Sequence, residues 1–329
     1  MVEIEVMTPP RQILPGKLWF ITVRAVNRCY RFAPTRKALE TIWFCLACTL
    51  HKYRGRIEIH EFLWMSNHYH VVLTDCGACL PHFMAELDSL LARALNALYG
   101  ISGTAIEKGY NLVAVESDVK AMEHCVYTLA NPCSAHLVKR SRHWEGVSSQ
   151  GLNYGVPITV KRPRHGLWSG ACGHVQGEAS QRSTRARFGG RTKLPEEVEL
   201  VLTRPPVMLD LSDAELRKHV RDRLDERELA LSAERRARRA TVVGWRAARR
   251  VSIWASPQTE ELFGLVPSFS ADTNKRRGAA RTRRLEFVRR YYEALARFVG
   301  GERDVAFPKG TWLMRERFKV RCEPLVLSA

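Results

Sequence analysis

The stretch "WMSNHYHVVL", residues 64–73, places two histidines one residue apart at the start of a run that is typical of a β-strand. Side chains alternate along a strand, so His68 and His70 share one face while Tyr69 points to the other. We expect the tyrosine and the aliphatic residues to pack under helices and both imidazoles to emerge on the open face. Two neutral imidazoles can hold a divalent metal, although an isolated pair more often belongs to an ordinary half-exposed strand.

The segments around this stretch predict a sheet with helices. Only Ser66 and Asn67 separate the strand at 56–65 from the next one, which indicates an antiparallel hairpin. The order strand, helix, strand, strand, helix, strand, helix predicts an α+β fold with a ferredoxin-like antiparallel sheet and helices on one face. The predicted strands are 18–27, 56–65, 68–75 and 110–117, and the predicted helices are 35–55, 80–100 and 117–131.

The predicted helix 117–131 carries a polar stripe. His124, Tyr127 and Asn131 are spaced by three and then four residues, so they lie on one face. A tyrosine phenol is a usable nucleophile for covalent catalysis, but its ordinary pKa of ~10 means that it needs assistance at neutral pH. Tyr127 could equally be a surface or core-edge tyrosine. Pro132 is expected to stop or kink the helix, and Asn131 could instead be the N-cap of a short helix that begins at Pro132.

The positive charge of the chain is concentrated in its second half. The formal net charge is +18, and residues 1–160 contain 16 Lys and Arg against 13 Asp and Glu. Residues 161–329 contain 36 Lys and Arg against 21 Asp and Glu. Such an excess indicates a polyanionic partner, with nucleic acid favoured over an anionic membrane surface.

Two arginine-rich stretches, 210–250 and 275–298, are predicted to be helical. The second could track phosphates, or it could be a solvated charged face with aromatic anchors. Residues 165–193 are rich in Gly, Ser and Arg and lack periodicity, which indicates a flexible segment. The residues predicted to contact DNA are Lys275, Arg276, Arg277, Arg289 and Arg290. The predicted division is a catalytic domain at 12–160, a linker or insertion at 161–194, and a mainly helical basic extension at 195–329.

Cysteine content and hydropathy suggest a reduced, cytoplasmic protein. There are nine cysteines, no apolar run of the ~20 residues that a membrane helix needs, and no basic-then-apolar leader. Two C-x-x-C pairs, Cys45/Cys48 and Cys76/Cys79, could together form a zinc site. The first pair, however, lies in an apolar helical pattern, where cysteine usually serves as a small buried hydrophobe.

The two polar motifs together resemble the single-tyrosine HUH transposases, especially the REP-associated tyrosine transposase branch. Met65, Asn67, His68 and His70 match the first family motif over residues 64–73. The segment "YTLANPCSAHLV", residues 127–138, matches the second motif through Tyr127, Asn131, Pro132, Ala135, Leu137 and Val138. The resemblance covers roughly residues 12–150.

This resemblance implies an HUH endonuclease fold and a transposase that cleaves and rejoins single-stranded or hairpin DNA. His68 and His70, with Asn131, would hold Mg²⁺ or Mn²⁺ at the scissile phosphate. Tyr127 would form a 5′-phosphotyrosine and release a 3′-hydroxyl. The protein would be prokaryotic and associated with the nucleoid, with no membrane partner, and the sequence leaves open whether it is a monomer or a homodimer.

Some positions depart from the family pattern. Ser66 stands where proline is usual in the family. Gly109 stands where an arginine commonly precedes the tyrosine that is Tyr110 here. Ser134 and His136 replace an arginine and a glycine. No departure removes a predicted metal ligand or the nucleophile. The alternative is therefore a domesticated nucleic-acid-binding protein that retains the fold with weakened or no catalysis.

Overall fold

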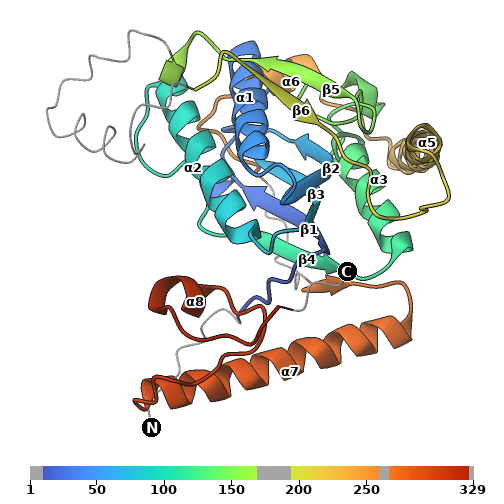
Figure 1. Ribbon diagram of the computed structural model, residues 1–329. Helices are drawn as coiled ribbons and strands as arrows, with labels where there is room; N and C mark the ends of the chain where they lie inside the picture. The colour runs from blue at the N-terminus through green and yellow to red at the C-terminus, as the bar shows by residue number, and fades with distance from the viewer. Residues whose placement is uncertain (1–9, 169–193, 259–266, 326–329) are drawn as a thin grey trace, which may run out of the picture.

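The computed structural model describes residues 10–168, 194–258 and 267–325, and this part of the chain forms an α+β fold (Figure 1). It contains one mixed five-stranded sheet, one two-stranded sheet and seven α-helices. The strands are β1 (Lys17–Arg24), β2 (Ile57–Trp64), β3 (His68–Asp75), β4 (Asn111–Val115), β5 (Pro157–Lys161), β6 (Glu197–Val201) and β7 (Phe269–Ser270). The helices are α1 (Arg36–Lys52), α2 (Leu80–Tyr99), α3 (Asp118–Ser134), α5 (Asp213–Ala237), α6 (Trp245–Arg250), α7 (Asn274–Val299) and α8 (Leu313–Phe318).

The large sheet has the strand order β2-β3-β1-β4-β7. Its first three pairings are antiparallel, as predicted, and the β1–β3 register places Thr22 opposite His70 and Arg24 opposite His68. The expectation of a purely antiparallel sheet is wrong, because the two-residue strand β7 joins β4 in parallel. So short a strand, 150 residues beyond β4, carries no signal of its own in the sequence.

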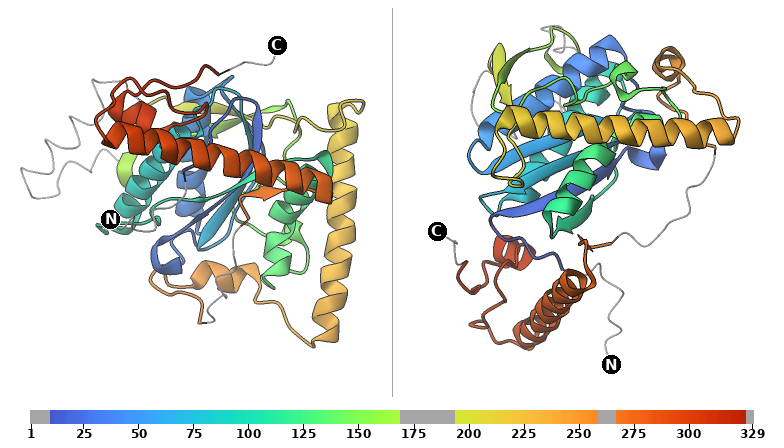
Figure 2. Two further views of the ribbon diagram at one scale, coloured as in Figure 1. Left: turned by 90° about the horizontal axis from the view of Figure 1, so that it is seen from below. Right: turned by 90° about the vertical axis from the view of Figure 1, so that its right-hand side faces the viewer.

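Helices cover both faces of this sheet, which corrects the prediction of helices on one face. Helices α1 and α2 lie on one side and α3 on the other (Figure 1; Figure 2, left view). Tyr69 is fully buried on the α1–α2 side, where its hydroxyl donates to Asp88 of α2. His70 faces the opposite way and meets Asn131 of α3. The apolar side chains of α3, such as Met122, need burial as well, so this helix covers the face that was expected to be open.

The helix that carries the polar stripe is longer than predicted. It begins with the Ser117 side chain accepting the Lys120 backbone N–H, and it passes through Pro132 to end at Ser134. Proline has no N–H for the carbonyl four residues earlier, but this loss falls in the last turn, where it is tolerated. Asn131 therefore lies inside the helix, and its alternative role as an N-cap is excluded.

Strand β2 is an edge strand of the large sheet. Segments of the same protein that do not belong to the sheet cover this edge. The backbone of residues 147–149 bonds to β2, with Trp64 N donating to Val147 O at 2.8 Å and Ser149 N to Phe62 O at 3.0 Å. Thr203 N donates to Ile59 O at 2.8 Å. A β-bulge between Ile59 and Glu61 shifts the register against β3 at this point.

Helix α5 packs across α3, at a large angle to it, on the side away from the sheet (Figure 2). It starts with a capping box between Ser212 and Glu215, and it buries Leu216, Val220 and Leu224 in the main core. That core continues from Leu18 to Ala248, so residues before and after the predicted 161–194 segment share it. The predicted domain boundaries remain predictions, and residues 169–193 of the predicted linker lie outside the described residues.

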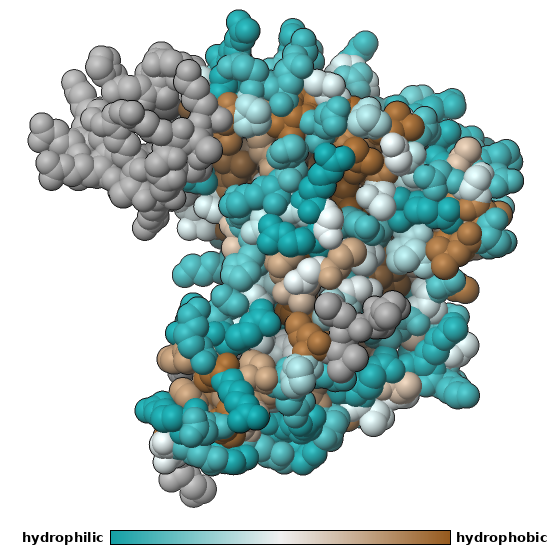
Figure 3. All heavy atoms as spheres, in the orientation of Figure 1, coloured by the Kyte–Doolittle hydropathy of each residue, from teal (hydrophilic) through white to brown (hydrophobic). Residues whose placement is uncertain are grey.

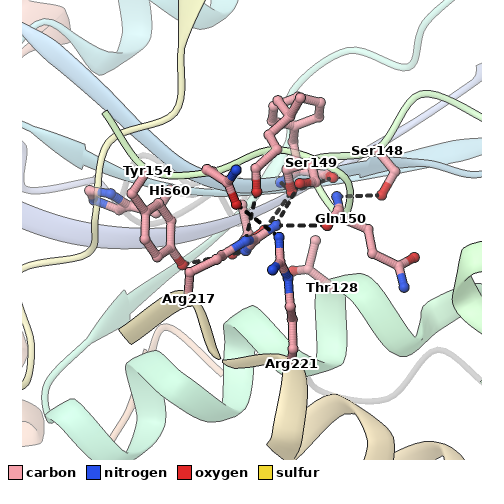
Figure 4. Close-up of polar contacts among 12 residues, drawn as sticks. His60, Thr128, Ser148, Ser149, Gln150, Tyr154, Arg217 and Arg221 are labelled. Carbon is pink, nitrogen blue, oxygen red and sulfur yellow. Dashed lines mark hydrogen bonds and ion pairs between the residues drawn. The ribbon is translucent and has the colours of Figure 1, made fainter. Parts of the chain in front are cut away.

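A buried ion pair attaches α5 to the edge of the sheet (Figure 4). Arg217 of α5 and Glu61 of β2 are both buried and bonded to each other. Arg217 Nε also donates to the Leu152 carbonyl at 2.8 Å. The Tyr154 hydroxyl donates to Glu61 at 2.8 Å, and the Ser149 hydroxyl bonds to the same carboxylate. Because every charge has several partners, the pair can remain ionised without contact with water.

The predicted basic helix at 210–250 is in fact two helices, because the chain leaves the helix after Ala237 and turns at Gly244, which has a φ of 83°. Helices α7 and α8 lie below the sheet in Figure 1 and have a core of their own. The buried members of this second core are Phe287, Tyr291, Ala294, Val305, Phe307, Met314 and Val320.

The face shown in Figure 3 is mainly hydrophilic, with hydrophobic side chains in small separate patches. Within the described ranges, no helix is long and apolar enough to cross a membrane.

Candidate functional site

The sheet and α3 bring His68, His70, Tyr127 and Asn131 together. The His68 and His70 rings have centroids 4.9 Å apart, and those of His70 and Tyr127 are 5.4 Å apart. The Asn131 side-chain Nδ2 donates to His70 Nε2 at 3.2 Å. Four residues predicted from two separate motifs therefore form one cluster between β3 and α3.

Neighbouring side chains fix the two imidazoles. His68 Nδ1 donates to Asn67 Oδ1 at 2.8 Å, which orients this ring. His70 Nδ1 and the Thr22 hydroxyl share a hydrogen bond of 2.9 Å. His70 is only 4% exposed, and burial, together with the charges of His68 and Arg24, lowers its pKa well below the usual range. His70 is therefore neutral at neutral pH.

Tyr127 is the accessible member of the cluster. Its side chain is 47% exposed, whereas Asn131 is 6% exposed. It lies one helical turn before Asn131, and its ring meets the edge of Phe20 at 5.8 Å between centroids. A substrate can thus reach the phenol from solvent, while the rest of the Tyr127 ring is held against Phe20 of the sheet.

Phe20 and His124 belong to the site, although sequence reasoning assigned neither a role there. The Phe20 ring from β1 stacks on His124 at 4.4 Å and on His70 at 5.3 Å. Burial lowers the pKa of His124 to about 4, so this imidazole is also neutral. The helical spacing places His124 beside Tyr127, but only the pairing of β1 with β3 reveals the contribution of Phe20.

A pocket of about 640 Å³ opens at Tyr127, with apolar and charged side chains from α3 and α5. Arg223 and Arg227 of α5 line it beside Glu123 and Glu226. Arg223 lies 3.5 Å from Glu226, and both side chains are largely exposed. Because the packing of α5 on α3 is a long-range contact, no local pattern predicts that these arginines lie near Tyr127.

The five cations predicted to contact DNA lie on α7, and none of them lines the Tyr127 pocket as described. Arg276 pairs with Asp272 at 2.8 Å, and Arg289 pairs with Glu286 and Glu293, each at 2.7 Å. Arg290 pairs with Glu323. Three of these cations therefore form ion pairs within the protein, whereas Lys275 and Arg277 have no ion pair among the described residues.

The donor set can be tested against a divalent metal. Two imidazoles, each oriented by a hydrogen bond at Nδ1, are typical of metal-ligating histidines. Asn131 presents Nδ2 to His70, so it would have to turn its amide to offer Oδ1 as a ligand. With that rotation the residues fit a metal with nitrogen and oxygen ligands. Imidazole favours Mn²⁺ over Mg²⁺, which prefers oxygen.

The described residues do not gather the two C-x-x-C pairs into one group of metal ligands. Cys45 is fully buried in α1, and its thiol has a pKa raised well above the usual range by burial. Cys79 lies at the N-cap of α2 and bonds through its backbone N–H to Asp75. Within residues 10–168, 194–258 and 267–325, no group of three or more His, Cys, Asp or Glu could hold a metal. The packing interpretation of Cys45 is confirmed.

Two solved structures are distantly similar to part of this chain. One is a REP-associated tyrosine transposase bound to a REP hairpin, which has 20% identity and a TM-score of 0.34 over 45% of this chain and 82% of that chain. The other is tRNA(His) guanylyltransferase from Saccharomyces cerevisiae, with 14% identity and a TM-score of 0.31 over 40% of this chain and 65% of that chain. No family model and no curated protein matches the sequence.

Proposed function

We propose that this protein is a metal-dependent transesterase of single-stranded DNA, a tyrosine transposase of the HUH type. The observation that carries the proposal is the meeting of Tyr127 and Asn131 with His68 and His70, although Tyr127 lies 57 residues after His70 in the chain. The order β1-α1-β2-β3-α2-β4 with antiparallel pairing supports the ferredoxin-like assignment.

In the proposed reaction, Tyr127 Oη attacks the scissile phosphorus. A bond forms between Oη and phosphorus, the bond from phosphorus to the 3′-oxygen breaks, and the phenolic proton is transferred so that a 3′-hydroxyl leaves. The 5′-phosphate stays on Tyr127. The number of phosphoester bonds is conserved, so a later attack by a 3′-hydroxyl can rejoin a strand without an external energy source.

The residues around Tyr127 have separate tasks in this scheme. His68, His70 and Asn131 would hold the metal, which when bound makes the phosphate more electrophilic. Asn67 and Thr22 orient the two imidazoles through the hydrogen bonds described above. Arg24, opposite His68 in the sheet, and Arg223 at the pocket supply positive charge for the DNA backbone.

The test uses single-stranded oligonucleotides that contain an imperfect hairpin, labelled at the 3′ end and incubated with Mn²⁺ or Mg²⁺. We expect a covalent adduct that retains the 3′ label on a denaturing gel, and no adduct after EDTA. Tyr127→Phe should abolish it, because the phenolic oxygen is the attacking atom. Tyr292→Phe, which removes a hydroxyl from α7, is the matched control and should retain it.

An adduct that survives in Tyr127→Phe would show that another residue is the nucleophile. A 5′-labelled oligonucleotide gives a second readout, since the released fragment should end in a 3′-hydroxyl that a polymerase can extend. An adduct carrying the 5′ label would contradict the proposed polarity.

The second candidate function is a nucleic-acid-binding protein without cleavage activity. One observation favours it: both ring nitrogens of His70 already have partners within the protein, Thr22 and Asn131. In this case the hydrogen bonds would serve the packing of α3 on the sheet. Tight binding of hairpin DNA with no adduct in any metal would support this candidate over the first.

A further inference from the structure

A second groove lies away from the Tyr127 pocket, between α1 and β5. Its volume is about 900 Å³, and it shares no lining residue with the pocket at Tyr127. Four segments distant in sequence form it: Pro34 with the first half of α1, Glu145, residues 158–165, and Arg249 from α6. Since β5 lies on α1, these segments hold a fixed arrangement.

The lining of this groove is predominantly basic. Two carboxylates, Glu40 and Glu145, stand among five cations, and His165 adds a group that can become positive. A concave surface of one sign concentrates the electrostatic field and attracts a ligand of the opposite charge. The five cations are Arg36, Lys161, Arg162, Arg164 and Arg249.

Two of these cations are available for a ligand. Arg36 pairs with Glu40 at 3.0 Å. Lys161 pairs with a carboxylate within β6, and Arg162 pairs with the carboxylate just before β6. Arg164 and Arg249 are exposed and form no ion pair with any described residue. They come from different segments of the chain, so the charge at the groove does not depend on one element.

The groove also has an aromatic and apolar floor. Trp43 is half-buried there, and its ring meets Phe62 edge to face at 5.4 Å, which fixes its orientation. Leu39 and Ile158 lie around it. Cations that follow a backbone, together with an aromatic ring on which bases stack, are characteristic of surfaces that bind single strands.

We infer that this groove binds a short segment of single-stranded nucleic acid, with phosphates at Arg164 and Arg249 and a base against Trp43. A volume of about 900 Å³ is the size of a ligand pocket and not of a double helix. A free inorganic anion would leave the apolar floor exposed, whereas a nucleotide chain covers both features. The site does not depend on the proposed catalytic function, and it would hold a strand segment apart from Tyr127.

The experiment measures binding of fluorescein-labelled oligo(dT) by anisotropy in the full-length Tyr127→Phe protein, without metal. Arg164→Gln with Arg249→Gln should weaken binding at least fivefold. The slope of log K against log salt should become shallower by about 1.4, because each phosphate contact to a single strand contributes roughly 0.7. Arg236→Gln with Arg238→Gln removes the same charge from exposed positions outside the groove and should change binding less than twofold.

A second variant tests the stacking. Trp43→Phe keeps the contact with Phe62, and it should weaken oligo(dT) binding while leaving binding of an acidic peptide unchanged. The inference is overturned if both arginine pairs weaken binding equally, or if duplex DNA or polyglutamate competes as well as oligo(dT). Because metal and Tyr127 are absent, a failure of cleavage leaves this result unaffected.

Discussion

His60 shows how one buried side chain makes the stability of this protein depend on pH. It is fully buried beside the β2 bulge, where Nδ1 donates to the Thr203 carbonyl at 2.9 Å and Nε2 accepts from the Thr74 hydroxyl at 2.8 Å. Burial lowers its pKa to about 4. The ring is therefore neutral in the folded state, and protonation would remove the acceptor that Thr74 uses.

This pKa predicts loss of stability in mild acid. Between pH ~6.5 and about 4 the unfolded chain binds a proton at His60 that the folded protein does not, so the free energy of unfolding falls with pH. The full effect is about 3 kcal/mol. Urea unfolding at pH 7 and pH 4.5 should show a smaller difference for His60→Gln than for the wild type.

The control is His143→Gln, which alters an exposed histidine and should leave the wild-type pH difference intact. If His60→Gln were as sensitive to pH as the wild type, other groups would account for the acid response.

For individual residues, the sequence predicted which side chains form the site better than it predicted the side chains around them. Strand alternation placed His68 and His70 on one face and Tyr69 on the other, as the structure has them. Phe20 and Arg24 could not be assigned, because the register between two strands about 50 residues apart depends on packing throughout the sheet.

Arg217 forms a buried ion pair between helix α5 and the sheet. Its exposed face is rich in ion pairs that contribute little, whereas Arg217 is buried against Glu61. Removal of one partner from a buried pair leaves an uncompensated charge, which costs about 3–5 kcal/mol. This pair therefore adds to the apolar packing of Leu216, Val220 and Leu224 in holding α5, which forms one wall of the Tyr127 pocket.

Arg217→Met should lower the free energy of unfolding by about 3–5 kcal/mol and accelerate hydrogen exchange in α5. Arg221→Met is the control from the next turn: this exposed arginine bonds to Asn153, and its loss should change stability by less than about 0.5 kcal/mol. Adding Glu61→Gln to Arg217→Met should recover part of the loss. No recovery would indicate that the cost comes from packing.

Local patterns predicted most elements up to α3, but not those formed by long-range contacts. The cap at Ser117 and the 3.6-residue periodicity were enough to place α3, although Pro132 suggested too early an end. Strands β5 and β6 pair across 35 residues, and β7 has only two residues. None of these strands has a pattern that separates it from a loop before its partner is known.

For the molecule as a whole, the main feature is the presence of two hydrophobic cores. The larger spans the sheet with α1, α2, α3 and α5, and the smaller lies between α7 and the segment up to Val320. Backbone contacts such as Ile13 N to Gly310 O, at 2.9 Å, join the smaller unit to the segment before β1. We expect the two cores to respond separately to substitution.

Phe307→Ala tests this separation, since Phe307 is fully buried in the smaller core. The cavity should cost about 3–5 kcal/mol locally, and hydrogen exchange should accelerate in α7 and α8 but not in α1 and α2. Phe318→Ala, at an exposed position of α8, should have a much smaller effect. Equal acceleration in α1 would show that the two cores unfold as one cooperative unit.

The covered edge of β2 has a consequence for how copies of this protein meet one another. An open edge strand offers unpaired N–H and C=O groups to a neighbouring chain, and this is a common route to aggregation and to dimers that share a sheet. Here the backbone of residues 147–149 and Thr203 already occupies those groups, and the opposite edge is the two-residue β7. Association by continuous strand pairing is thus disfavoured, and concentrated solutions should resist fibril formation at β2. A contact between copies at this edge of the large sheet therefore has to use side chains.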